Sequence, residues 1–73
     1  MKAILEFNLP EDQNEFELMN QARKAQSFLW DFNEQLRSWH KYGHSFKDAD
    51  DALHEIREQW YRLMNEHGVD LDL

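Results

Sequence analysis

The chain of 73 residues contains no cysteine. Disulfides and thiolate metal sites are therefore excluded, although both commonly stabilise domains of this size. A chain this short buries only about 60% of its unfolded surface, so a core of its own is marginal. The length allows a single domain, and self-association is the remaining route by which we expect it to gain stability.

Basic residues are also scarce. Eight Lys and Arg stand against fifteen Asp and Glu, which gives a net charge of −7. This balance argues against sequence-independent binding of DNA or RNA, because such binding needs basic side chains to displace counterions. It argues equally against binding to an anionic membrane surface.

Long apolar runs are missing as well. No stretch approaches the roughly 20 apolar residues that cross a bilayer. The first six residues lack the apolar core and the cleavage site of a signal peptide. We therefore expect a soluble protein that has no membrane contact and resides in the cytoplasm.

What the sequence does contain is two helical stripes of apolar residues. They recur at alternating steps of four and three, the spacing of one helix face. The first stripe predicts a helix over residues 10–41, with proline in its first turn and Gly43 after its end. The second predicts a helix over 48–67, capped by Ser45 or Asp48 and ended by Gly68. The stripes are Leu18, Ala22, Ala25, Leu29, Phe32, Leu36 and Trp39, then Ala49, Leu53, Ile56, Trp60, Leu63 and His67.

These elements predict an all-α fold, an antiparallel helical hairpin with a turn at 42–47 and a tail at 68–73. Residues 1–9 alternate loosely and form either a short strand or an extended arm over the helices. The first helix exceeds the second by roughly 15 Å, at 1.5 Å per residue. The arm or a partner must cover the excess, and we expect two hairpins to dimerise as a coiled-coil-like four-helix bundle.

A second series on the first helix is the most informative feature for function. On an ideal helix it lies more than about 100° from the apolar stripe and mixes aromatic with basic side chains. Such a mixture is typical of binding hot spots. The alternative is that residues 1–9 fold over this series and make it part of the core. With Tyr61 of the second helix, the candidate interface comprises Phe16, Met19, Arg23, Trp30 and Arg37.

No constellation in the sequence indicates catalysis. His40 and His44 are four residues apart, but Gly43 interrupts the helix between them, and two histidines do not complete a metal site. A glycine-rich phosphate loop and a nucleophile–base pair are both missing. We therefore predict that the protein is not an enzyme and uses neither a cofactor nor a metal.

Several segments resemble a family of small uncharacterised bacteriophage proteins. They are residues 2–12 (KAILEFNLPED), Phe16, 29–32 (LWDF), 36–37 (LR), 41–42 (KY) and 68–71 (GVDL). The resemblance covers most of the chain but contains no catalytic motif. It implies a phage or prophage product acting in the cytoplasm of a bacterial cell. The family has no established activity, so the resemblance assigns no site residues.

Three functions from different classes follow. The first is a protein–protein interaction module that docks on itself or on a host or phage protein. The second is an acidic inhibitor that mimics nucleic acid and blocks a DNA-binding or defence protein. The acidic residues do not form one continuous strip along the sequence, because residues 18–47 carry five basic residues against two acidic ones. The third is a dimer that binds nucleic acid through Arg23, Lys24, Arg37 and Lys41, which the net charge disfavours.

Overall fold

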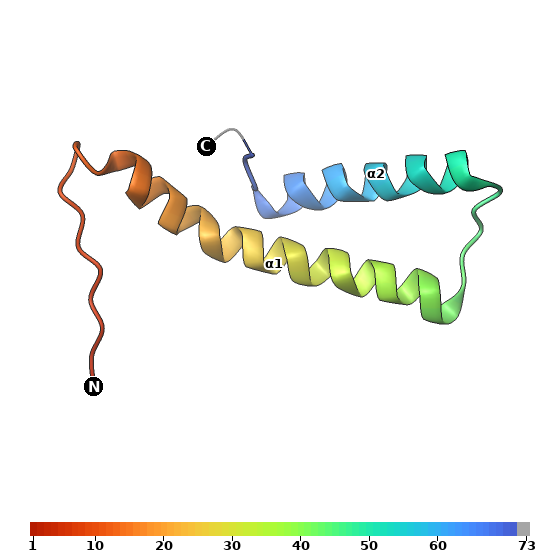
Figure 1. Ribbon diagram of the computed structural model, residues 1–73, viewed down its shortest axis with the longest axis horizontal. Coiled ribbons are helices and arrows are strands. Elements are labelled where there is room, and N and C mark those ends of the chain that lie inside the picture. Colours follow the sequence, from red (N-terminus) through yellow and green to blue (C-terminus); the bar gives the residue numbers. More distant parts are fainter. Residues whose placement is uncertain (72–73) are drawn as a thin grey trace.

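The computed structural model describes residues 1–71 and contains two antiparallel helices, α1 (Gln13–Tyr42) and α2 (Ala49–His67), joined by residues 43–48 (Figure 1). The prediction of an all-α fold with helix–helix packing is confirmed. Residues 1–8 and 69–71 contain no strand, so the strand alternative for residues 1–9 does not form and the described part of the tail is irregular. The last two residues of the predicted tail, 72–73, lie outside that part.

The first helix begins three residues later than the expected start at Pro10. Residues 9–12 form a turn, in which the Asp12 N–H donates to the Asn8 carbonyl at 2.7 Å. The Asp12 carboxylate accepts from the Asn8 N–H at 2.9 Å and makes no capping bond to α1. The carboxylate therefore stabilises the turn, and the helix starts only after it.

Of the two candidate caps for α2, Asp48 is the one that acts. Its Oδ1 accepts from the Asp51 N–H at 2.8 Å, and the Asp51 carboxylate accepts from the Lys47 N–H at 3.0 Å. Gly43 follows α1 with φ +97° and ψ 172°. Gly43 thus ends the helix as expected, but the chain leaves it in an extended conformation at positive φ and not in the left-handed helical one.

The second helix ends at Gly68, as its sequence position predicts. Gly68 has φ +67° and ψ 34°, in the left-handed region. Its N–H donates to the Asn65 carbonyl at 3.3 Å, and the Val69 N–H donates to the Met64 carbonyl at 2.9 Å. These two bonds form a Schellman motif, which satisfies carbonyls that the helix end would otherwise leave unpaired.

Three aromatic rings join the helices. The Trp60 ring lies edge-on to Phe28 at 4.6 Å and to Phe32 at 5.1 Å between ring centroids. Among the described residues, only Phe28 and Leu63 are buried, with exposed fractions of 3% and 5%. The core is therefore small even for a chain of this length.

The side of α1 that faces α2 differs from the predicted stripe. Phe28, which the stripe omits, is at its centre, and Gln35, also outside the stripe, accepts a hydrogen bond from Gln59 across the helices at 3.1 Å. Leu29 and Leu36, predicted to be core, are 57% and 40% exposed. Trp60 accounts for the difference, because it packs against both Phe28 and Phe32 and so turns that side of α1 inward.

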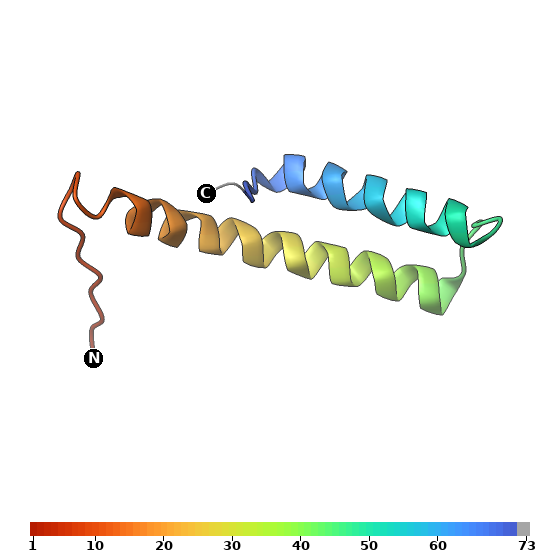
Figure 2. The same ribbon diagram turned by 45° about the horizontal axis from the view of Figure 1, so that its top comes forward.

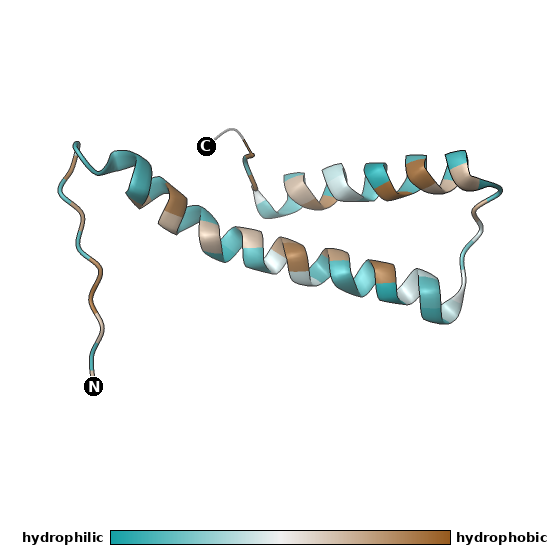
Figure 3. Ribbon diagram, viewed as in Figure 1, coloured by the Kyte–Doolittle hydropathy of each residue, from teal (hydrophilic) through white to brown (hydrophobic). Residues whose placement is uncertain are grey.

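The molecule is elongated, because α1 extends well past the end of α2 (Figure 2). Its Cα radius of gyration is 17.0 Å, against about 11 Å for a compact domain of this length. Apolar residues are distributed along the N-terminal segment and along both helices (Figure 3). In the described residues, neither helix has the length and hydropathy of a membrane span.

Candidate interaction surface

One open side of the hairpin is apolar, and we call it the leucine face. On α1 its residues are rotated by about 80–120° from Phe28 in one direction around the helix. On α2, Leu53 is rotated from Leu63 by about 80° in the same sense. Because the two helices are antiparallel and face each other, equal senses of rotation lead to the same side of the hairpin. Leu53 is 67% exposed. The leucine face comprises Leu18, Ala22, Leu29, Leu36 and Leu53.

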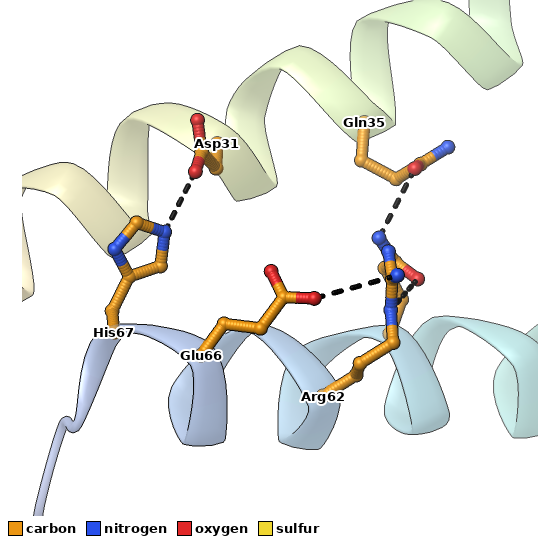
Figure 4. Close-up of polar contacts among 6 residues, drawn as sticks. Asp31, Gln35, Arg62, Glu66 and His67 are labelled. Atoms are coloured by element: carbon orange, nitrogen blue, oxygen red, sulfur yellow. Dashed lines mark hydrogen bonds and ion pairs between the residues drawn. The ribbon is translucent and has the colours of Figure 1, made fainter.

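The opposite open side is polar. His67 of α2 reaches Asp31 of α1, where Nε2 lies 2.6 Å from Oδ2 (Figure 4). The Gln59 amide donates to Gln35, and Gln59 accepts from the Arg62 guanidinium at 3.1 Å. Hydrogen bonds between the helices thus close this side. On the leucine face, large apolar side chains flank the contact between the helices instead of hydrogen-bonded polar ones.

A third surface lies on α1 roughly opposite α2, and we call it the tryptophan face. It contains four of the residues that the sequence nominated as an interface. The Trp30 side chain is 65% exposed, and Met19 is 47% exposed. Shallow hollows flank Trp30, one bordered by Gln26 and Leu29 and the other by Asp31. The tryptophan face comprises Met19, Arg23, Trp30 and Arg37.

The other two nominated residues lie apart from Trp30. Phe16 packs edge-on against Phe7, with ring centroids 5.6 Å apart. Tyr61 belongs to α2 and lies under the guanidinium of Arg57, 5.4 Å from the ring centroid. The N-terminal segment therefore covers Phe16 and leaves Trp30 exposed. This arrangement differs from the alternative in which the segment encloses the whole series.

The basic residues of α1 do not gather in one place. Arg23 and Lys41 share the outer side of the helix by spacing, whereas Lys24 is rotated from each of them by about 100°. The Arg37 guanidinium lies 4.0 Å from the Glu34 carboxylate. A continuous basic strip is therefore not formed by these side chains.

The histidines and acids engage in local contacts. The His44 ring stacks on Phe46 at 4.5 Å, and its Nδ1 accepts from the Phe46 N–H at 3.2 Å. Within residues 1–71 no three His, Asp or Glu side chains come together as potential metal ligands. Asp12, Asp48 and Asp51 accept backbone hydrogen bonds around the helix starts. These acidic residues thus stabilise the folded chain through hydrogen bonds to its backbone.

Sequence reasoning missed Phe28, the most buried of the residues that the structure describes. A usable signal was present, because Phe28, Phe32, Gln35 and Trp39 also follow steps of four, three and four. The spacing alone allowed two overlapping stripes on one helix.

Comparison of the chain with protein-family models, curated proteins and solved structures finds no match in any of the three.

Proposed function

We propose that this protein is a non-catalytic interaction module that binds other protein surfaces through the exposed apolar side chains of α1. One observation carries the proposal. In residues 1–71 only Phe28 and Leu63 are buried, whereas Leu18, Leu29 and Trp30 on α1 are each more than half exposed. Large apolar side chains in rows on an open surface are typical of sites that bind another protein.

The shape of the molecule supports the same function. Its accessible surface is 6495 Å², whereas a compact protein of this mass exposes about 4,800 Å². The excess of about 1,700 Å² exceeds the roughly 800 Å² that each partner buries in an interface of standard size. A second protein can therefore cover surface that the hairpin leaves open.

The resemblance to small bacteriophage proteins gives this proposal its setting. In the proposed setting, the module acts in the cytoplasm of an infected or lysogenic bacterium and docks on another copy of itself or on a host or phage protein. The partner surface would be apolar at its centre, to match the leucine face or the tryptophan face. No reaction or cofactor is part of the proposal.

Two measurements on the same preparation test the proposed function. The first is the solution mass over a wide concentration range, and the second is capture of bacterial proteins on the immobilised chain. Association with itself, or capture that Leu29→Glu or Trp30→Glu removes, is the expected result. A monomer at every concentration that also captures no protein would show that the proposed function is wrong.

A further inference from the structure

We propose that a second copy of this chain covers the leucine face, with the two α1 helices antiparallel and related by a two-fold axis near residue 27. This inference rests on the proposed function and names the partner of that surface. The resulting assembly is a four-helix bundle in which α1 packs against α1. Three features of the molecule favour a second copy over an unrelated protein.

The first feature is that the α1 face complements itself. In a two-fold interface, residue i contacts residue j and residue j contacts residue i. With the axis at residue 27, Leu18 meets Leu36 of the second copy, since both are nine positions from the axis. Ala25, at the edge of this face, likewise meets Leu29 of the second copy. At this pair a small residue opposes a large one, which lets the two helices approach closely.

The second feature is charge. The beginning of the chain before α1 and its first turns carry Glu11, Asp12, Glu15 and Glu17, with no basic residue before Arg23 except Lys2. The last turns of α1 carry Arg37 and Lys41. Antiparallel pairing brings the acidic beginning of one α1 beside the basic end of the other. Parallel pairing would place like charges together, which is unfavourable.

The third feature is that the exposed surface of the hairpin is large, whereas its core is small. The two buried residues of the described chain, 1–71, form too small a core to hold a hairpin of this length, and chains below about 70–80 residues commonly gain stability by association. The excess accessible surface of about 1,700 Å² per copy is enough for an interface of standard size or larger. The second copy therefore supplies the apolar neighbours that Leu29 and Leu36 lack within one chain.

Solution mass tests the proposed face. The wild-type chain should sediment as a dimer, at twice 8.9 kDa. Leu29→Glu places a charge in the interface of both copies and should raise the dissociation constant on the order of 100-fold. Trp30→Glu is the matched control, because residue 30 is next in sequence, is 65% exposed and lies on the tryptophan face. It should change the dissociation constant less than about threefold.

Disulfide cross-linking tests the orientation and does not depend on a variant that unfolds. The chain has no cysteine, so Leu18→Cys and Leu36→Cys each introduce a single thiol. In the antiparallel dimer two copies of residue 18 lie about 27 Å apart, too far for a disulfide. Oxidation of either variant alone should therefore give little disulfide-linked dimer. Oxidation of an equimolar mixture should cross-link residue 18 of one copy to residue 36 of the other.

The outcomes separate this inference from the proposed function. A wild-type monomer that still captures another protein would overturn the inference and leave the interaction module in place. Efficient cross-linking of Leu18→Cys to itself would show a parallel dimer and overturn the orientation. Dissociation by Trp30→Glu but not by Leu29→Glu would move the interface to the tryptophan face, against the inference.

Discussion

His67 Nε2 lies 2.6 Å from Asp31 Oδ2, and this contact connects the end of α2 to the middle of α1 across 36 positions of sequence. The two side chains are 22% and 48% exposed, so water screens the interaction in part. A double-mutant cycle with Asp31→Ala and His67→Ala should give a coupling energy of roughly 0.5–1 kcal/mol. Urea unfolding of the four proteins measures it.

The Glu34–Arg37 pair provides a comparison for that cycle. It lies within α1 at 4.0 Å, with side chains 44% and 63% exposed. Its coupling energy should be smaller, about 0.2–0.5 kcal/mol at most. Equal coupling in the two cycles would mean that the contact across the helices stabilises the hairpin no more than a local surface pair does.

Phe28 should be the most sensitive position for folding. Phe28→Ala removes a ring that is 3% exposed and packs on Trp60 at 4.6 Å, so we expect a loss of about 3–5 kcal/mol. Trp30→Ala, two positions away, should change the free energy of unfolding by less than about 0.5 kcal/mol. Chemical unfolding followed by circular dichroism compares them. The reverse order would mean that α1 presents a different side to α2.

Gly68 should be required for its backbone conformation and not for the space around it. A Cβ there would lie 3.9 Å from Lys24 Nζ, an ordinary contact. The φ of +67° is nevertheless unfavourable for alanine, so Gly68→Ala should cost roughly 1–2 kcal/mol. Gly68→Asn should cost less, because asparagine tolerates the left-handed region better. Equal costs in thermal unfolding would contradict this explanation.

Asp48 should stabilise the beginning of α2 more than its acidic neighbour. Asp48→Ala removes the oxygen that accepts from the Asp51 N–H at 2.8 Å, and the expected loss is about 1 kcal/mol. Asp50→Ala removes a charge from the same first turn without removing a capping bond. Its expected loss of stability is therefore smaller, and at most about 0.3–1 kcal/mol. If both variants lose equal stability, charge alone accounts for the effect.

Local signals in the sequence determined most of the secondary structure. The three-to-four spacing, the cap at Asp48 and the glycine after His67 each act over a few neighbouring residues, so they can be read without knowing the fold. The start of α1 was predicted three residues early, because the Asp12 carboxylate bonds to Asn8 and not to the helix. Spacing alone also placed Trp30 away from the predicted stripe, while it left open whether residues 1–9 cover this residue.

Only the tertiary structure decided which side of α1 meets α2. Apolar residues cover a wide arc of this helix, so stripes through Phe28 and through Leu29 satisfy the same period. The choice depends on Trp60, which lies 28 positions beyond Phe32 and packs edge-on against both phenylalanine rings. Sequence spacing fixes the angle between residues of one helix, but not the direction of its neighbour. Packing sets that direction, and it leaves Leu29 and Leu36 at the surface.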